Sequence, residues 1–76
     1  IKVYPNPASD YLFITKLNES KSDVEIYDCY DRVVLRQELY HQDTGINLLN
    51  FTDGIYLLKL IDESGNIFNT SFCVIR

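Results

Sequence analysis

The longest apolar run in the chain follows directly on a turn signal, and this combination constrains the fold more than any other feature. The dipeptide Asp53-Gly54 is typical of tight turns, and the apolar run continues from Ile55 to Ile61. The run is too short to cross a membrane as a helix, and turn residues bound it at both ends, as they do in a buried strand. Because side chains alternate along a strand, Tyr56, Leu58 and Leu60 are predicted to share one buried face.

The Gly-x-Tyr pattern at Gly54 and Tyr56 is similar to the tyrosine corner of immunoglobulin-like sandwiches. In that motif the ring packs at the edge of the core, and the hydroxyl bonds to backbone a few residues upstream. Such domains have a cysteine two residues after the tyrosine, whereas this chain has Leu58. We therefore predict that this stretch is a core strand of a small β-sandwich.

The rest of the chain divides into short strand-like segments separated by turn residues. Turn signals recur about every 8–12 residues, and no segment has a convincing helical period. The pattern predicts an all-β fold, a small immunoglobulin-like β-sandwich of about seven antiparallel strands, formed by residues 1–76 as one domain. The six further strands are predicted at Ile1–Tyr4, Tyr11–Thr15, Val24–Tyr27, Arg32–Tyr40, Ile46–Leu49 and Ile67–Ile75.

Two of these segments carry more detailed expectations. Val33, Leu35 and Leu39 share the apolar face of the fourth segment, and Gln37 interrupts them, so we expect a bulge or an exposed end at Gln37. The residues from His41 to Gly45 are predicted to form a loop.

The composition excludes several function classes. The chain of 76 residues has a net charge of −4 and a pI of about 4.6, and its seven basic residues are scattered. Without a basic stripe, binding to nucleic acid or to an anionic membrane surface is not expected, and no segment is predicted to insert into a membrane. Because Ile1 already lies in a strand-like segment, we expect the chain to be a piece of a longer polypeptide.

Two cysteines, Cys29 and Cys73, leave two readings open. A pair in a small domain permits one disulfide, and free cysteines are also among the most buried residue types. Zinc binding is disfavoured, because His41 is the only histidine and no Cys-x-x-Cys pair exists.

No set of residues in the chain predicts catalysis. There is no phosphate loop, no Gly-x-Ser-x-Gly and no metal-ligand spacing, so neither an enzyme nor a cofactor is expected. The acidic segment Asp62–Asn66 has oxygen ligands that suit calcium, but it lacks the EF-hand spacing, and a hairpin loop at Gly65 is the preferred interpretation. Exposed tyrosines could stack on sugars or pack across strands. The candidates are Tyr11, Tyr27, Tyr30 and Tyr40.

The order of motifs along the chain resembles one family. The opening Val3–Asp10 contains Tyr-Pro-Asn-Pro, the middle has Val24–Asp28 leading through a reversal to Arg32, and Gly54–Leu60 precedes a final apolar strand. This order is similar to the C-terminal sorting domain of type IX (Por) secretion cargo proteins, the type A class of the Bacteroidetes. The resemblance covers essentially the whole chain.

The resemblance implies a non-catalytic export signal. It implies that a cargo domain is covalently linked before this one, that the cargo reaches the cell surface or medium by way of the periplasm, and that the outer-membrane machinery recognises the tag. The implied partners are the translocon, shuttle and sortase components of that machinery. The sortase is expected to remove the tag and join the cargo to a lipopolysaccharide anchor.

The resemblance also assigns residues. The family-motif residues are Tyr4, Pro5, Asn6, Pro7, Asp10, Tyr27, Asp28, Arg32, Gly54 and Tyr56.

The terminal strands suggest how a partner could recognise the domain. Terminal strands of a sandwich expose unpaired backbone groups, so a partner could dock by adding a strand. The candidates are the first strand, which Pro5 and Pro7 limit, and the last strand. The candidate recognition residues in the last strand are Phe72, Cys73, Val74, Ile75 and Arg76.

The chain departs from the family pattern at two positions. Asp31 stands where the family usually has glycine, and Asp tolerates the left-handed region, so the turn is expected to survive at some cost. Arg76 alone stands where the family often has a short basic stretch. The alternative function is an immunoglobulin-like module that binds carbohydrate or protein through its loops and exposed tyrosines.

Overall fold

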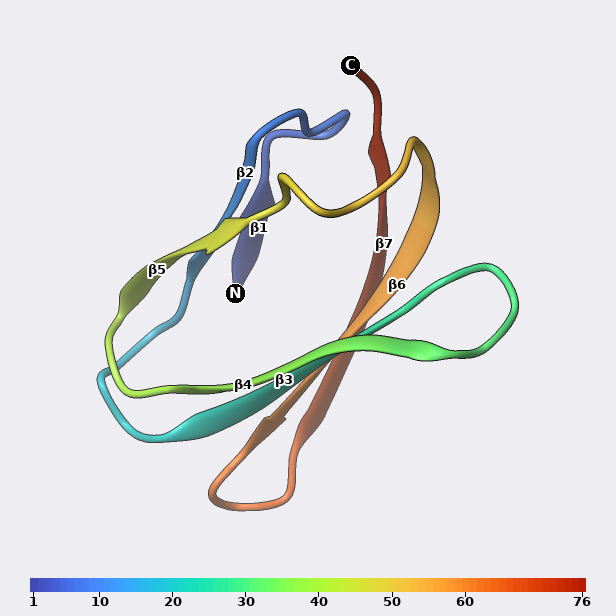
Figure 1. Ribbon diagram of the computed structural model, residues 1–76. Helices are drawn as coiled ribbons and strands as arrows, with labels where there is room; N and C mark the ends of the chain where they lie inside the picture. The colour runs from blue at the N-terminus through green and yellow to red at the C-terminus, as the bar shows by residue number, and fades with distance from the viewer.

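Seven antiparallel strands in two facing sheets make up the fold, as Figure 1 shows. The computed structural model describes all of residues 1–76 and contains no helix, so none is long and apolar enough to cross a membrane. One sheet has the order β1-β2-β5 and the other the order β4-β3-β6-β7, which confirms the predicted β-sandwich. The strands are β1 (Lys2–Tyr4), β2 (Tyr11–Thr15), β3 (Ser22–Tyr27), β4 (Val33–Leu39), β5 (Asp43–Asn47), β6 (Gly54–Asp62) and β7 (Ile67–Val74).

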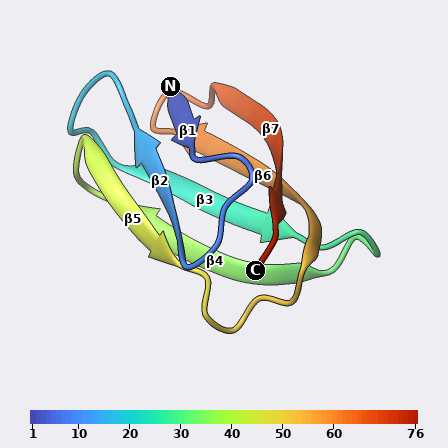
Figure 2. The same cartoon turned by 90° about the horizontal axis from the view of Figure 1, so that it is seen from above.

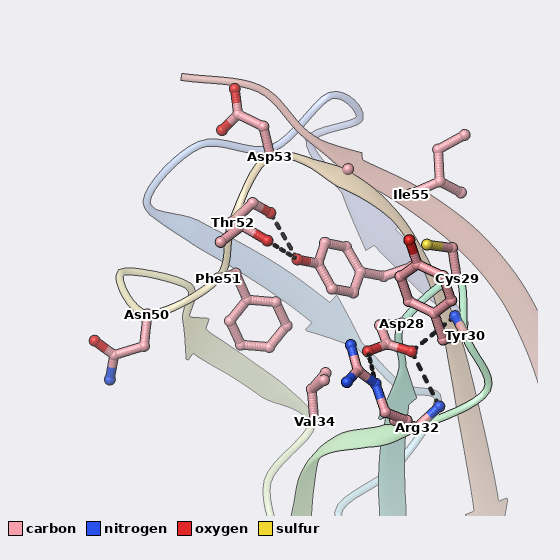
Figure 3. A pocket seen from close by; sticks show the side chains of 12 residues that line it. Asp28, Cys29, Tyr30, Arg32, Val34, Asn50, Phe51, Thr52, Asp53 and Ile55 are labelled. Carbon is pink, nitrogen blue, oxygen red and sulfur yellow. Dashed lines mark hydrogen bonds and ion pairs between the residues drawn. The ribbon is translucent and has the colours of Figure 1, made fainter.

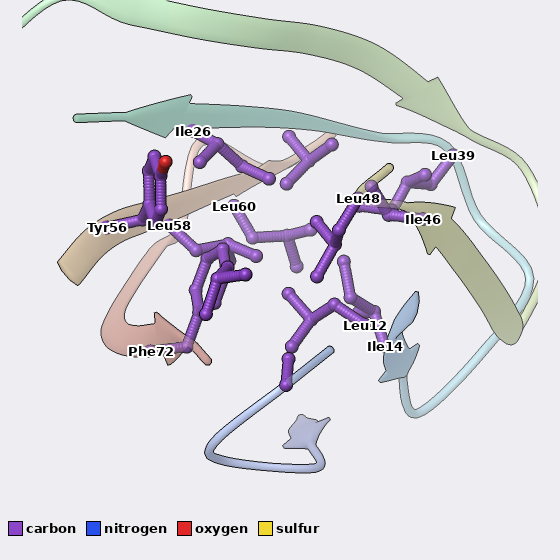
Figure 4. Packing of buried hydrophobic residues seen from close by; sticks show 13 residues of the cluster. Leu12, Ile14, Ile26, Leu39, Ile46, Leu48, Tyr56, Leu58, Leu60 and Phe72 are labelled. Atoms are coloured by element: carbon purple, nitrogen blue, oxygen red, sulfur yellow. The ribbon is translucent and has the colours of Figure 1, made fainter. Parts of the chain in front are cut away.

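The core lies between the two sheets and is built from the alternating faces that the sequence predicts (Figure 4). Tyr56, Leu58 and Leu60 of β6 are all buried, while their neighbours on the other face of the strand are more exposed. Burying each large apolar side chain contributes roughly 1.5–3 kcal/mol. Both sheets supply core residues, so neither sheet can bury its apolar face without the other. The remaining large core side chains are Leu12, Ile14, Val24, Ile26, Leu39, Ile46, Leu48, Phe72 and Val74.

The predicted position of the fifth strand is wrong. The prediction was Ile46–Leu49 with a loop up to Gly45, whereas β5 covers Asp43–Asn47 and pairs with β2 along its whole length. Gly45 lies opposite Phe13 in this pairing, and a Cβ atom on Gly45 would approach the Phe13 ring to 3.1 Å. Glycine therefore leaves room for the Phe13 ring at a position where sequence patterns favour a loop.

The bulge in β4 is also not where the sequence places it. Gln37 pairs in register with Val24 and is exposed, and the irregularity lies where Ile26 pairs with Leu35 and Tyr27 pairs with Val33. The extra residue is Val34, so Val33 turns away from the face that Leu35 occupies and is 41% exposed. Gln37 stays in water because β4 is an edge strand whose inner face is only partly covered.

The loop between β1 and β2 crosses from one sheet to the other. Figure 2 shows it bending toward the C-terminal half of β7, and Ala8 in this loop forms an isolated parallel bridge with Val74. The N-terminus lies at the other end of β1 from this loop (Figure 1). The two sheets are thus joined by backbone pairing close to the C-terminus.

Candidate functional site

The Tyr-Pro-Asn-Pro motif and the end of the chain, far apart in sequence, are in direct contact. The Asn6 side-chain oxygen accepts hydrogen bonds from the Cys73 backbone N–H at 3.1 Å and from the Cys73 thiol at 3.4 Å. Ala8 N–H donates to the Cys73 carbonyl at 2.8 Å, and Ile75 N–H donates to the Ala8 carbonyl at 2.9 Å. The Tyr4-Pro5 and Asn6-Pro7 peptide bonds are both cis. The motif therefore acts as a short extra strand on the edge of β7.

Arg76 is held against the loop that joins β5 to β6. Its guanidinium donates to the backbone carbonyls of Leu48 and Phe51. It also lies 3.9 Å from a carboxylate oxygen of Asp10 and 3.9 Å from one of Asp53. Arg76 thus links the opening motif, through Asp10, with the turn before β6.

Tyr56 forms the predicted tyrosine corner. Its hydroxyl donates to the Thr52 carbonyl at 2.6 Å, four residues upstream, and the residue is only 6% exposed. Its ring packs edge-on against Phe51 and stacks on Phe72, with centroids 5.1 and 5.6 Å apart. Gly54 opens the strand beside it with a φ of 158°, and a Cβ there would meet nothing within 4 Å.

Asp28 organises the reversal between β3 and β4 (Figure 3). One carboxylate oxygen accepts the backbone N–H groups of Tyr30 at 2.8 Å and Arg32 at 3.0 Å, and the other accepts the Arg32 side chain at 2.8 Å. The pKa of Asp28 lies below its usual value, chiefly because of the bond from the Arg32 backbone N–H. Asp31 adopts a φ of 65°, which confirms that Asp takes the left-handed position of this turn.

Tyr27 belongs to a polar network on the outer face of β3 rather than to the reversal. Its hydroxyl donates to Glu25 at 2.8 Å, and Arg36 pairs with the same carboxylate at 3.0 Å. The Tyr27 pKa is raised chiefly by the bond to Glu25, and the Glu25 pKa is lowered chiefly by that same bond and then by the one from Arg36.

A cleft of about 310 Å³ separates the Asp28 reversal from the tyrosine corner (Figure 3). Arg32 and Tyr30 line one side of the cleft, and Phe51, Thr52 and Ile55 line the other. The Arg32 guanidinium lies 5.2 Å from the centroid of the Tyr30 ring. No group of three or more His, Cys, Asp or Glu side chains is placed to hold a metal ion. Cys29, which lines the cleft, and Cys73 are both free thiols. The two cysteines therefore form no disulfide with each other.

The candidate recognition strand is largely built into the fold. Phe72 and Val74 lie in the core, and Cys73 is half-buried beneath Asn6. Ile75 is 57% exposed, and Arg76 is bound to the β5–β6 loop as described above. The family-motif residues therefore fall into three groups. Those from Tyr4 to Asp10 and from Gly54 to Tyr56 lie around the C-terminal strand. Asp28 and Arg32 lie across the cleft from them, and Tyr27 lies apart on the outer face of β3.

Two buried residues were not predicted from the sequence, Ala8 within this arrangement and Lys16 at the opposite end of the sandwich. Ala8, only 1% exposed, provides the backbone bridge to β7, and nothing in its side chain marks it. Lys16 is buried, and its ammonium donates to the carbonyls of Ser20 at 2.5 Å and Leu39 at 3.3 Å. A signal for Lys16 did exist, because it follows Leu12 and Ile14 at every second position.

Comparison with known proteins identifies the family. A family model described as "Secretion system C-terminal sorting domain" matches residues 2–74. The chain is 32% identical over 77 residues to an endo-acting ulvan lyase of Formosa agariphila, a match that covers 97% of this chain and 14% of that protein. This chain therefore corresponds to only a short part of that lyase.

A solved structure shares the fold. PorZ of Porphyromonas gingivalis, described as an essential bacterial surface component of the type IX secretion system, superposes with a TM-score of 0.82 at 26% identity. The superposition covers 99% of this chain and 11% of PorZ. Because the family model spans nearly every residue and the PorZ fold agrees throughout, this chain belongs to the secretion system C-terminal sorting domains of the type IX system, which sort proteins and are not enzymes.

Proposed function

We propose that this domain directs a covalently attached cargo protein across the outer membrane by the type IX system, and that a sortase then removes the domain and anchors the cargo at the cell surface. The observation that carries the proposal is the family match over residues 2–74. The cargo passes through the periplasm before the translocon and shuttle components engage the domain. The domain itself serves only as the sorting signal.

The geometry supports a division of labour between the two ends of the domain. A cargo joined before Ile1 is attached at the start of β1, whereas Asn6, Ala8 and the C-terminal strand meet at the other end of β1 (Figure 1). The cargo therefore leaves that other end accessible to a large partner. We assign recognition to the C-terminal strand, whose last residues, Phe72–Arg76, lie at this end.

The first test is an export assay with a folded reporter. The reporter, preceded by a periplasmic signal peptide, is fused before Ile1 and expressed in a bacterium with a type IX system. We expect the intact fusion to reach the cell surface or the medium. A fusion without Ser71–Arg76 is expected to remain in the periplasm. Equal export of both fusions would contradict the role of the final strand.

A point substitution separates recognition from unfolding. Arg76→Ala removes the contacts to Asp10, Asp53 and two carbonyls, while Arg36→Ala removes one exposed ion pair with Glu25 and serves as the matched control. We expect Arg76→Ala to reduce export and Arg36→Ala to leave it unchanged, with both variants folded by circular dichroism. The mass of the surface-bound reporter reports whether the domain has been removed.

A further inference from the structure

The two edge strands of the four-stranded sheet differ in how well they are protected. Edge strands expose unpaired backbone groups, and proteins usually guard them with charges, bulges or a covering segment. β4 has such protection, because it carries Arg36 and Glu38 and is bulged at Val34. The other edge strand, β7, has no charged residue between Ile67 and Val74 and pairs with β6 without a register shift.

Only the C-terminal half of β7 is covered. Asn6 and Ala8 bond to Cys73 and Ile75 on the side away from β6. No other segment pairs with this side, because the only strand partner of β7 is β6 and the only isolated bridge is that of Ala8. The half of the edge from Ile67 to Ser71 therefore faces solvent, and Ile67, Asn69 and Ser71 are all exposed.

The direction of the backbone groups along β7 follows from the bonds already described. The N–H and C=O groups of Cys73 point away from β6, toward Asn6 and Ala8. Alternate residues of a strand direct their backbone groups to the same side, so Ser71, Asn69 and Ile67 also point away from β6. Each offers one donor and one acceptor with no strand opposite.

We propose that this open half of β7, Ile67–Ser71, accepts an extended strand from a protein component of the secretion machinery. The proposal rests on the proposed function, which supplies the kind of partner. An extended backbone is the ligand whose donors and acceptors match an open edge, and such pairing is an established mode of peptide recognition. The Ala8 segment already pairs with the same edge within the molecule, and the partner strand lies in line with it.

A second copy of this domain is a less favourable partner for the open edge than a strand of another protein. Two copies joined edge to edge through β7 would bring together two domains that each have a net charge of −4, and their repulsion opposes association.

The test uses a substitution that removes an outward N–H and spares the native ladder. Asn69→Pro deletes the Asn69 donor, and proline is tolerated on an edge strand where the N–H faces solvent. Asn69→Ala is the matched control, because it changes the same side chain and keeps the backbone donor. Both are introduced into the reporter fusion, and folding is measured by thermal unfolding of the domain.

We expect the wild-type and Asn69→Ala fusions to be exported, and export of Asn69→Pro to fall up to about tenfold, as loss of one backbone hydrogen bond implies. A folded Asn69→Pro variant that is exported normally overturns the proposal. Failure of the wild-type fusion to be exported would instead contradict the proposed function.

A second variant covers the case in which Asn69→Pro does not fold. Ser71→Lys places a charge on the open edge and keeps every backbone group, with Ser71→Ala as its control. Loss of export in Ser71→Lys alone supports the strand partner, and normal export of a folded Ser71→Lys overturns it. A concentration-dependent dimer that Ser71→Lys abolishes would show that a second copy occupies the edge, and would also overturn the proposal.

Discussion

Two turns at opposite ends of the four-stranded sheet have the same construction. Asp28–Arg32 joins β3 to β4, and Asp62–Asn66 joins β6 to β7. In each turn, the first residue is an aspartate whose carboxylate accepts the backbone N–H groups of the third and fifth residues. The four distances are 2.8 Å from Tyr30 and 3.0 Å from Arg32 to Asp28, and 2.9 Å from Ser64 and 2.9 Å from Asn66 to Asp62.

The turns differ at their fourth residue. This position takes a positive φ in both, 65° at Asp31 and 85° at Gly65. Glycine adopts such angles freely, whereas other L-residues do so at a cost. The leading aspartate therefore sets the turn, and the left-handed residue only adjusts its stability. Changes of pH and of these residues distinguish the two roles.

Acid is expected to weaken both turns at once. The pKa values of Asp28 and Asp62 lie below the usual 3.8, chiefly through the backbone N–H groups of Arg32 and Asn66. Because a lowered pKa in the folded state favours folding only while the group is ionised, this stability is present above about pH 4 and is lost as the pH falls through the folded-state values. Thermal unfolding from pH 6 to pH 2 should show the Tm falling mainly below about pH 4. A flat profile in this range would refute the role of the carboxylates.

Asp28→Ala and Asp62→Ala should each lower the Tm, and by similar amounts, because each removes three hydrogen bonds within its turn. The matched variants Asp28→Asn and Asp62→Asn keep one oxygen acceptor and should lower the Tm less. Asp28→Asn also breaks the ion pair with Arg32, so its effect should shrink in high salt. If only one alanine variant loses stability, the two turns are not equivalent.

Gly65→Ala is expected to destabilise the domain by about 1–2 kcal/mol, because alanine at this φ is strained. No atom lies within 4 Å of the added Cβ, so the effect isolates the backbone from packing. Urea unfolding measures it. A change below about 0.3 kcal/mol would show that the turn relaxes to another conformation.

Asp31→Gly is the reverse substitution, and it is expected to change the free energy of unfolding least. It places at the first turn the residue type that the second turn already has. We expect a gain of up to about 1 kcal/mol, since relief of strain is partly offset by the greater entropy of glycine in the unfolded chain. A loss of stability in the same urea assay would mean that the Asp31 side chain supports the turn.

Much of the fold was predictable because alternation along a strand directly reflects burial. Leu12 and Ile14, Val24 and Ile26, and the three residues of β6 all proved to be inward-facing. The Tyr56 hydroxyl bond followed from a local pattern, Gly-x-Tyr, whose partner lies only four residues away. Local patterns of this kind need no knowledge of the pairing between strands.

The errors and omissions depend on contacts between distant segments. Gly45 lies in a strand paired with Phe13 of β2, and the Val34 bulge lies where β4 pairs with β3. The bridge of Ala8 to Val74 joins residues near the two ends of the chain, and a small apolar side chain gives no sign of it. The motif order pointed to the residues of the site, but it did not show that the opening motif pairs with the final strand.

The burial of β7 has a consequence for the timing of folding during synthesis. Phe72 and Val74 are 2% and 0% exposed, so the core cannot close until the ribosome has added them. The Asn6 and Ala8 segment likewise has no partner until Cys73 has been made. A polypeptide that stops before this strand therefore lacks a finished domain, whatever has folded ahead of it. If the domain directs export as proposed, chains that terminate before Phe72 lack the folded signal and are not expected to be exported.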